Sequence, residues 1–328
     1  MFTELPDNQF ENSSILLIIP VFNDWESLEL LLMHLDEVFK EGNVRAEVLV
    51  VDDASSISAP DSFKSSNFKA INKVYVLELR RNLGHQRAIA IGLAYVEANI
   101  KCQAVVVMDG DGEDAPRDVL RLIVQCDKEG YEKIVFARRT KRSESQMFKI
   151  FYLIYKWLYK LLTGQEINVG NFSIIPYKIL RRIVVVSEIW NHYAAGIFKA
   201  KLPSTHIPCK RGVRLAGQSK MKFVSLVSHG LSAISVYGDI IGVRFLVAIF
   251  FLMLFSVSLI AVILVVRIAI PNWAPYVAGL SFIILLQSMT ISLSFVFLIL
   301  NGRNNFGFLP KRDYHYFILD VQQVFPEA

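Results

Sequence analysis

The chain has 328 residues, a formal net charge of +5 at pH 7 and 53% hydrophobic residues. This length suits one large domain or two small ones, and the apolar excess at about 243–300 excludes a wholly soluble protein. Basic residues gather in 138–149 and 199–222. Because no nucleic-acid module or basic–aromatic pattern accompanies them, we expect phosphate and anionic lipid as their partners, and no nucleic acid.

Residues 1–220 alternate apolar runs with helically periodic segments. The runs predict strands at Ser14–Pro20, Ala46–Val51, Lys73–Leu79, Ala104–Met108 and Lys133–Ala137. The periodic segments predict helices at Asp24–Lys40, Leu83–Asn99 and Arg117–Lys128. Both faces of the strands are apolar, which indicates an α/β fold with a mostly parallel sheet flanked by helices. The polar, acidic N-terminus predicts no cleavable signal peptide, so we expect residues 1–220 to form a cytosolic domain.

Two further helical segments are predicted before the apolar region at about 243–300. Gln146–Leu162 is rich in aromatic residues, and we expect it to lie against the membrane or the core. Phe223–Ile241 carries an apolar stripe opposite a stripe of serine and histidine. This pattern predicts an interfacial helix at 221–242, and a helix that packs on the protein core is the alternative.

Two apolar runs follow, at about 243–266 and 276–300. Each exceeds the roughly 20 residues that cross a bilayer core, so residues 243–300 are expected to form a two-helix transmembrane hairpin. Basic residues are more frequent after the second run than between the two, which places both ends in the cytoplasm. We therefore expect a multi-pass protein of the inner (cytoplasmic) membrane, with a cytosolic tail at 301–328.

The segment Val105–Pro116 reads VVVMDGDGEDAP, and its apolar strand ends abruptly in acidic residues. Side chains two positions apart on an extended backbone point the same way, so Asp109, Asp111 and Glu113 are expected to converge. Three carboxylates at one point favour a hard divalent cation. The alternative is a polar turn that caps a helix near Pro116. The carboxyl end of a parallel strand is where open α/β sheets bind ligands, which favours a metal and phosphate site.

Other predicted strands end in polar residues that would meet at the same edge. Asp24 follows the first strand, Asp52 and Asp53 end the second, and Gly84 follows the third. Asp24 and Asp52 can accept hydrogen bonds from a base or ribose, although Asp24 could cap a helix and the aspartate pair could form a turn. The glycine-rich dinucleotide motif and the P-loop are absent, which argues against a dinucleotide redox enzyme or a P-loop kinase.

Seven motifs occur in a characteristic order: IIPVFND, VDDAS, RNLGHQRAIAIGL, MDGDGEDAP, ARRTKR, GNFSIIP and AGQSKM. With the two apolar runs, the chain resembles the family 2 glycosyltransferases, in particular the membrane-bound branch of dolichol-phosphate mannosyltransferase and bactoprenyl-phosphate glucosyltransferase. The resemblance implies that residues 1–220 form a GT-A catalytic domain that takes a nucleotide-sugar donor and Mg²⁺ or Mn²⁺.

The resemblance also implies roles for residues of this chain. Asp109 and Asp111 would hold the metal, with Glu113 where the family often has glutamine, and Asp111 would act in catalysis. Asp24 and Asp52 would contact the nucleoside, with Asp53 beside it. The rest of the donor site would come from the same motifs, at Pro20, Val21, Asn23, Gly84 and Gly110.

The resemblance, together with the membrane hairpin, implies a polyprenyl phosphate as the acceptor. A polyprenyl phosphate is already anionic near neutral pH, so it needs cationic positioning rather than a strong base. Suitable residues are Arg139, which we also count as catalytic, and Arg142, Arg211, Arg214, Ser219 and Lys220. Attraction of these cations to lipid headgroups is the alternative. The family's bactoprenyl branch tends to have aspartate where this chain has Asn171, so either no base is needed or Glu188 serves.

We therefore predict an inverting, metal-dependent hexosyltransferase that moves one sugar to a polyprenyl phosphate at the cytoplasmic membrane face. A second hypothesis is transfer to a hydroxyl of a glycan or glycolipid acceptor, which needs a base such as Glu188. A third is a non-catalytic membrane scaffold that only binds nucleotide. The sequence leaves the sugar and the oligomeric state open, although the resemblance suggests homo-oligomer assembly through the hairpin.

Overall fold

The computed structural model describes residues 15–60, 63, 67–139, 146–166, 168–217, 223–269, 274–304 and 308–326. The chain divides into two compact units. The first, which we call the sheet unit, comprises Met1–Lys149, Ile167–Val236 and Phe308–Ala328. The second, the hairpin unit, comprises Ile150–Glu166 and Tyr237–Gly307.

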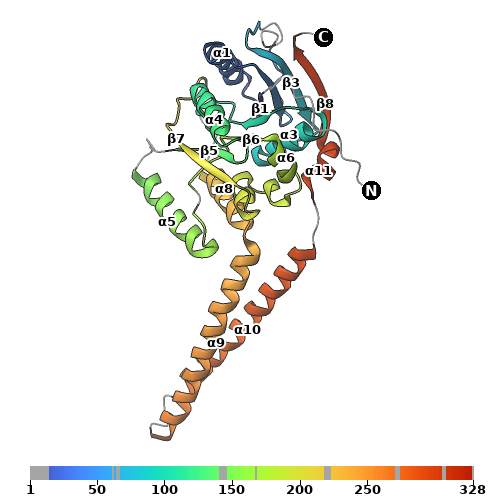
Figure 1. Ribbon diagram of the computed structural model, residues 1–328. Helices are drawn as coiled ribbons and strands as arrows, with labels where there is room; N and C mark the ends of the chain where they lie inside the picture. The colour runs from blue at the N-terminus through green and yellow to red at the C-terminus, as the bar shows by residue number, and fades with distance from the viewer. Residues whose placement is uncertain are drawn as a thin grey trace. The chain divides into compact units, whose positions relative to one another are not determined.

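Within the described residues, the sheet unit contains one eight-stranded sheet in the order β7-β5-β6-β4-β1-β2-β3-β8 (Figure 1). The strands are β1 (Ile15–Val21), β2 (Ala46–Asp52), β3 (Ile71–Leu79), β4 (Ala104–Val107), β5 (Ile134–Arg139), β6 (Ser173–Pro176), β7 (Ser204–Cys209) and β8 (Ile318–Phe325). β1 pairs in parallel with β2 and β4, β2 with β3, and β5 with β7. β6 and β8 run antiparallel to their neighbours.

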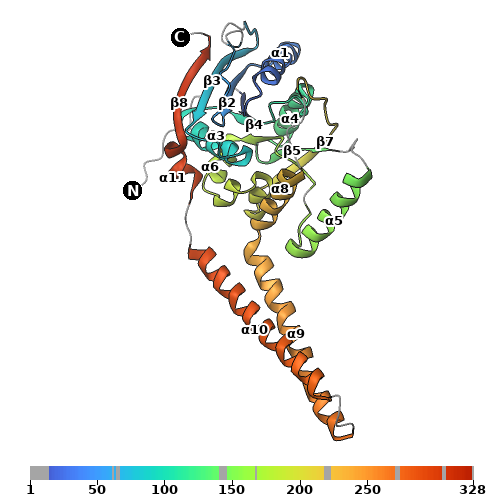
Figure 2. The ribbon, with the colours of Figure 1, turned by 180° about the vertical axis from the view of Figure 1, so that it is seen from behind.

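Helices cover both faces of this sheet. Leu17 and Ile19 of β1 join one core with α1 (Trp25–Glu41) and α4 (Pro116–Lys128), whereas the alternate residues Leu16 and Ile18 join a second core with other helices. Those helices are α3 (His85–Asn99), α6 (Tyr177–Ile183) and α7 (Tyr193–Lys199). Figures 1 and 2 show α1 and α4 on one side and α3 and α6 on the other. The two-residue period of a strand therefore produces two separate apolar layers.

The remaining elements of the sheet unit are shorter or lie near its boundaries. They are η1 (Ser187–Trp190), α8 (Phe223–Ser235), α11 (Pro310–Asp313) and η2 (Tyr314–Phe317). Phe308 stacks on Trp190 at 3.6 Å between ring centroids, and Arg87 lies over the Trp190 ring at 5.1 Å. The C-terminal segment is thus packed against α3 and η1 rather than left free.

The hairpin unit consists of α5 (Gln146–Thr163), α9 (Gly238–Ala269) and α10 (Ala274–Asn304). α9 and α10 run side by side (Figures 1 and 2). Both are long and apolar enough to cross a membrane, within Gly238–Val266 and Tyr276–Phe295. Only 17% and 11% of the most apolar windows are buried, so these helices do not resemble the core helices of a soluble protein.

The five predicted strands and the three helices between them are present, as are the two apolar helices. Three expectations differ. The expected tail at 301–328 instead contains β8, which pairs with β3, and α10 continues to Asn304. The expected single helix at 221–242 is broken, since α8 ends at Ser235 and α9 begins at Gly238. Val236 and Tyr237, at the break, are apolar and buried. The apolar pattern of the sequence is therefore continuous across the break and gives no sign of it.

The order of the strands creates a place for a ligand. The chain passes from β1 outward to β2 and β3, then returns to β4 on the other side of β1. Open α/β sheets bind ligands outside the carboxyl ends of the strands where the order reverses in this way. The residues after β1 and β4 therefore flank the expected crevice.

Candidate functional site

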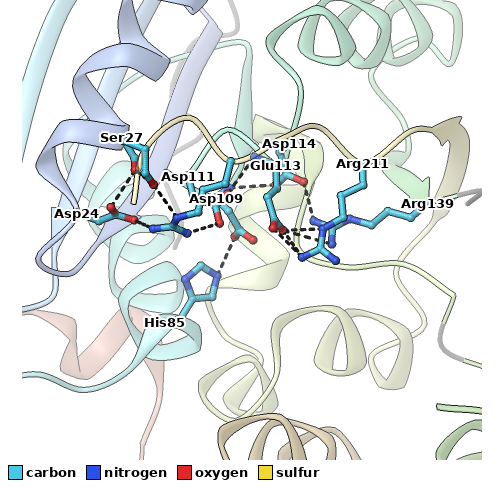
Figure 3. Close-up of polar contacts among 11 residues, drawn as sticks. Asp24, Ser27, His85, Asp109, Asp111, Glu113, Asp114, Arg139 and Arg211 are labelled. Carbon is cyan, nitrogen blue, oxygen red and sulfur yellow. Dashed lines mark hydrogen bonds and ion pairs between the residues drawn. The ribbon is translucent and has the colours of Figure 1, made fainter. Parts of the chain in front are cut away.

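The carboxyl edge of the sheet gathers the polar residues that the sequence singled out. Asp24 follows β1, Asp52 ends β2, Asp109 follows β4 and Arg139 ends β5. β6 runs in the opposite direction, so Asn171, which precedes it, lies at the same edge. These five residues come from five different strands of the sheet. Figure 3 shows contacts of three of them, Asp24, Asp109 and Arg139.

The acid loop, which we define as residues 108–115, is held from within by Asp114. One Asp114 oxygen accepts a hydrogen bond from the Asp109 backbone N–H at 3.1 Å, and the other accepts one from Arg139 at 3.1 Å (Figure 3). Asp114 is 3% exposed. Burial raises the pKa of Asp114, as does the charge of Asp109, while Arg139 opposes the shift. Asp114 therefore fixes both the loop and the Arg139 side chain.

The predicted convergence of three carboxylates is wrong for Glu113. Gly112 has a φ of +83°, so the backbone leaves the extended conformation on which the prediction depended. Glu113 turns to Arg211, which donates to its two oxygens at 2.7 and 2.8 Å. Within the part of the chain that the structure describes, no three histidine, cysteine or acidic side chains are grouped to hold a metal. The alternative also fails, because Ala115 occupies the N-cap position of α4 and no side chain caps that helix.

Asp111 and Asp24 are brought together through Arg214. Asp111 Oδ1 accepts a hydrogen bond from the Glu113 backbone N–H at 3.0 Å, and its Oδ2 lies 2.9 Å from an Arg214 nitrogen. The second terminal nitrogen of Arg214 pairs with Asp24. Asp24 also accepts a hydrogen bond from Ser27 Oγ at 2.9 Å (Figure 3), and it makes no side-chain cap of α1. Burial raises the pKa of Asp111, and the charges of Asp109 and Glu113 add to this.

Asp109 faces a histidine that the sequence analysis did not select. His85 Nε2 lies 3.1 Å from Asp109 Oδ1 (Figure 3) and 3.0 Å from Asn171 Nδ2. Burial lowers the pKa of His85, but Asp109, with smaller contributions from the charges of Asp114 and Asp111, outweighs this, so the net direction is upward. His85 begins α3, directly after Gly84, whose φ of +91° suits glycine. Its place in the RNLGHQ motif is the one sequence signal for it.

A divalent cation fits Asp109 and Asp111. Among the described residues, the buried Asp109 Oδ1 has no hydrogen-bond partner of good geometry, although His85 is near it. A buried carboxylate oxygen without a hydrogen bond is costly, and a cation would relieve that cost. Carboxylate oxygens are also the ligands that Mg²⁺ and Mn²⁺ prefer. Glu113 is paired with Arg211, as Asp111 is with Arg214, and its role as a third ligand stays a prediction.

The aspartates at the end of β2 have different positions. Asp53 is buried and accepts hydrogen bonds from the Leu83 and Gly84 backbone N–H groups at 2.7 and 2.8 Å, so it holds the loop before α3. Asp52 accepts one from the Ser55 N–H at 3.0 Å. Burial raises the pKa of both carboxyls. Asp53 therefore binds backbone in the loop before α3, whereas Asp52 binds Ser55, three residues farther along the chain.

The other predicted donor-site residues line the same edge. Asn23 closes the loops after β1 and β2, since its N–H donates to Ser55 Oγ at 2.8 Å and its Oδ1 accepts from the Ile57 N–H at 3.0 Å. Val21 is buried, and its carbonyl accepts from the Asp53 N–H at 2.9 Å. A Cβ at Gly110 would lie 3.3 Å from the Pro20 carbonyl oxygen, so β1 and the acid loop pass close together.

Some predicted residues are not joined to this cluster. Glu188 lies in η1, where it pairs with Lys199 at 3.3 Å and accepts a hydrogen bond from Ser187 at 3.1 Å. Arg142, Ser219 and Lys220 lie outside the described residues. Asn171 is joined, because its Oδ1 accepts from Gln86 Nε2 at 3.2 Å while its amide nitrogen meets His85.

A pair of histidines, His192 and His229, lies beside the cluster. His192 caps α7, with its Nδ1 accepting from the Ala195 N–H at 3.3 Å, and its ring lies 4.7 Å from that of His229 on α8. Burial lowers the pKa of His192 to about 3, and His229 adds to the shift. The charges of His85 and Asp109 both act on His229, so α8 reaches toward the acid loop. Nothing local in the sequence indicates this approach.

Relatives of known sequence can be set beside this geometry. The model of the family described as glycosyl transferase family 2 matches residues 16–190. The uncharacterized glycosyltransferase YkcC of Bacillus subtilis (strain 168) is 28% identical over 227 residues, 67% of each chain. The undecaprenyl-phosphate 4-deoxy-4-formamido-L-arabinose transferase of Salmonella choleraesuis (strain SC-B67) is 25% identical over 277 residues, 79% of this chain and 78% of its own.

Solved structures share the fold. Glucosyl-3-phosphoglycerate synthase from Mycobacterium tuberculosis, in complex with Mn²⁺, uridine-diphosphate-glucose and phosphoglyceric acid, matches with a TM-score of 0.51 and 13% identity over 70% of this chain and 80% of that chain. Mannosyl-3-phosphoglycerate synthase from Rubrobacter xylanophilus matches with a TM-score of 0.50 and 11% identity over 68% and 72%. At these identities the likeness concerns the GT-A-like α/β fold, which the sheet unit shares.

Proposed function

We propose, from the premise that this chain belongs to the glycosyl transferase family 2, that it transfers one sugar from a nucleotide-sugar donor to a polyprenyl phosphate at the cytoplasmic face of a membrane. The chain is a glycosyltransferase, and the proposal concerns its donor, its acceptor, inversion at the sugar and the need for a metal. The observation that carries the proposal is the position of Asp109 and Asp111 where the strand order reverses. There, within the described residues, the buried Asp109 Oδ1 has no hydrogen bond of good geometry, although His85 lies 3.1 Å away.

Asp109 and Asp111 would hold Mg²⁺ or Mn²⁺. When bound, such an ion neutralises charge on the diphosphate leaving group as a Lewis acid. The Mn²⁺ and uridine-diphosphate-glucose bound by the mycobacterial synthase support this assignment. Asp114 contributes by holding the Asp109 backbone at 3.1 Å, so the two carboxylates keep their positions before any ligand arrives.

The donor nucleoside would lie against the loops after β1 and β2. Asp24 and Asp52 carry the acceptor oxygens for a base or ribose, while Pro20, Val21, Asn23, Gly84 and Gly110 shape the edge beneath them. Asp53 supports this surface indirectly, because both its oxygens bind the backbone that leads into Gly84.

The acceptor proposal rests on Asn171, which stands where a catalytic base is expected. Asn171 is a neutral amide that cannot take a proton, and it is held between Gln86 and His85. A phosphate acceptor is anionic near neutral pH and needs no strong base, whereas a hydroxyl does. Arg139 is half-buried, ends β5 and is fixed by Asp114, so its charge is preorganised for an anionic group. The named Salmonella relative, an undecaprenyl-phosphate transferase, supports the same acceptor class.

We propose further that α9 and α10 anchor the chain in the inner membrane, with the sheet unit in the cytoplasm. Their apolar side chains are exposed, which is costly in water and favourable in lipid. α5 in the same unit adds an exposed apolar stripe of Leu153, Ile154, Trp157 and Leu161, and Trp157 is 66% exposed. A helix with such a stripe suits the membrane interface. Arg142, Ser219 and Lys220 remain candidates for acceptor phosphate contacts.

The test is a donor panel. Purified full-length protein in detergent, with Mn²⁺ and undecaprenyl phosphate, is incubated with radiolabelled nucleotide sugars, and the lipid fraction is extracted and counted. We expect one donor to label the lipid. Labelling of a glycan or glycolipid hydroxyl instead, with none of the polyprenyl phosphate, would reject the acceptor assignment.

Glu188→Gln separates the two acceptor classes. Because Glu188 is paired with Lys199 and is not joined to the acid loop, we expect turnover of this variant to remain within about threefold of the wild type. Glu132→Gln, which removes the carboxylate of the exposed pair with Lys178, is the matched control. Loss of turnover in the Glu188 variant alone would indicate that this residue is a base and that the acceptor is a hydroxyl.

A further inference from the structure

The segment Lys210–Gly217, which we call the cationic strap, follows β7 and lies along the acid loop. The Gly212 N–H donates to the Glu113 carbonyl at 2.7 Å, and the Leu215 N–H donates to the Asp111 carbonyl at 3.0 Å. Ser27 Oγ lies 3.1 Å from the Ala216 carbonyl, which ties the end of the strap to α1. The strap is therefore attached by backbone hydrogen bonds as well as by its charges.

Glycine makes this close approach feasible. A Cβ at Gly212 would lie 2.6 Å from the Gly112 carbonyl oxygen and 3.1 Å from that of Glu113, so any larger residue would collide with backbone. On the other side, a Cβ at Gly112 would lie 2.5 Å from Leu215 Cγ. The two segments fit together only because a glycine faces the partner segment in each.

The strap places two arginines on the acid loop, and they differ in what they neutralise. Arg211 pairs with Glu113, outside the proposed metal pair. Arg214 bridges Asp111, a proposed metal ligand, and Asp24, a proposed nucleoside contact. The side chains of Arg214 and Asp111 are only 17% and 22% exposed, so this pair is less screened than a surface salt bridge.

We propose that the cationic strap is a latch, in which Arg214 occupies the cation position at Asp111 until a divalent metal displaces it. The inference rests on the proposed function for the identity of the metal site. Asp111 Oδ1 already accepts the Glu113 N–H and its Oδ2 binds Arg214, so an ion that binds this carboxylate would lie close to the Arg214 charge. Two cations at one carboxylate repel each other. The released guanidinium would then be free, beside Asp24, to meet the donor phosphates.

The latch predicts an unusual gain of metal affinity on mutation. Full-length protein in detergent is titrated with Mn²⁺ alone, and free ion is followed by electron paramagnetic resonance. We expect Arg214→Gln to bind Mn²⁺ about tenfold more tightly than the wild type, since one charge-assisted pair no longer competes. Gly212→Ala changes no charge but lifts the strap, and we expect a gain in the same direction.

Arg211→Gln is the matched control, because it removes an equal charge from the same strap without touching Asp111. We expect its Mn²⁺ affinity to stay within about twofold of the wild type. If Arg211→Gln and Arg214→Gln raise the Mn²⁺ affinity equally, the loss of one positive charge explains both changes, and the latch is overturned. No Mn²⁺ binding by any variant, or no gain in Arg214→Gln, would overturn it as well.

Hydrogen exchange gives a readout that needs no activity. In the wild type, Mn²⁺ should speed exchange of the Gly212 and Leu215 amides, which donate to the acid loop. Unchanged protection would reject strap release. If Mn²⁺ speeds exchange of these amides but no donor labels the lipid, the proposed donor or acceptor is rejected and the latch is kept. If a donor labels the lipid but Mn²⁺ leaves the exchange unchanged, the latch is rejected and the proposed function is kept.

Discussion

The carboxyl edge of the sheet unit and the long helices of the hairpin unit treat polar groups in opposite ways. At the edge, buried carboxylates are paired across different strands, as Asp114 is with Arg139. In the hairpin, buried hydroxyls turn back on their own helix, as Ser256 does to the Leu252 carbonyl at 2.9 Å and Ser288 to that of Ile284 at 2.7 Å. Both arrangements give these buried groups a partner, which lowers the cost of burying them in a low dielectric. Only the first contains charged groups that could bind a ligand in place of their present partners. This difference supports the proposal that the reaction takes place at the edge and that the hairpin anchors the chain.

The largest expected effect removes one carboxylate from the edge. Asp111→Asn keeps the shape of the side chain and loses its charge, so we expect turnover with the best donor to fall by about 10³-fold. Initial rates of lipid labelling measure this. Asp320→Asn on β8 is the matched control and should retain wild-type rates, since Asp320 is exposed and far along the sheet order. Near-normal turnover of the Asp111 variant would remove the edge from the mechanism.

The second prediction introduces a charge into the hairpin. Leu252 lies near the middle of the Gly238–Val266 span and is exposed, so Leu252→Lys should cost about 3 kcal/mol for insertion of that helix. Val243→Lys lies near the start of the same span, where a lysine can reach the interface, and should cost much less. Alkaline extraction of membranes that contain each full-length variant measures the integrated fraction. Equal retention of both variants would show that α9 does not cross the membrane.

The smallest expected effect concerns acid stability of the sheet unit. Burial lowers the pKa of His192 to about 3 from an ordinary value near 6.5, so the folded state keeps the ring neutral. Its contribution is present above pH 6.5 and is lost as the pH falls from 6.5 toward 3, because the unfolded state takes up the proton first. Between pH 7 and pH 5 the loss should be about 2 kcal/mol.

His192→Asn tests this assignment, because asparagine still caps a helix but does not titrate. We expect the melting temperature of the wild type to drop more than that of the variant between pH 7 and pH 5, with His229 titrating in both proteins. Parallel pH profiles would place the acid sensitivity elsewhere. A variant that is less stable by the same amount at every pH would indicate loss of packing alone.

The sequence was sufficient where structure depends on short-range pattern. β1 to β5, the helices between them and the two apolar helices each correspond to a local run or period, and all are found. The position of Asp109 and Asp111 after β4 follows from the same reasoning. β6 has four residues and β8 lies half-exposed at the edge of the sheet, so neither has a pattern strong enough to predict.

The site was less predictable because its contacts join distant segments. The direction of Glu113 depends on the positive φ of Gly112, which the i, i+2 rule does not consider. Asp53 looked like a ligand-binding acid, yet it serves backbone 30 residues away. Arg214 meets Asp24 across 190 residues, and His85 meets Asp109 from another strand connection. The types of residue and their order in the sequence identify candidates for such a site, but tertiary packing determines which residues they contact.

The pairing of β8 with β3 has a consequence for biosynthesis. Val74 pairs with Phe325 and Leu79 with Ile318, so the outer edge of β3 stays open on the ribosome until α9 and α10 have been made. An open strand edge is prone to wrong association. If both helices cross the bilayer, β8 returns to the side of the membrane on which β3 lies. A chain that inserts only one of the helices leaves β8 on the opposite side and cannot complete the sheet. Sheet closure would thus act as a checkpoint on membrane topology, so that only correctly inserted chains acquire a finished catalytic fold.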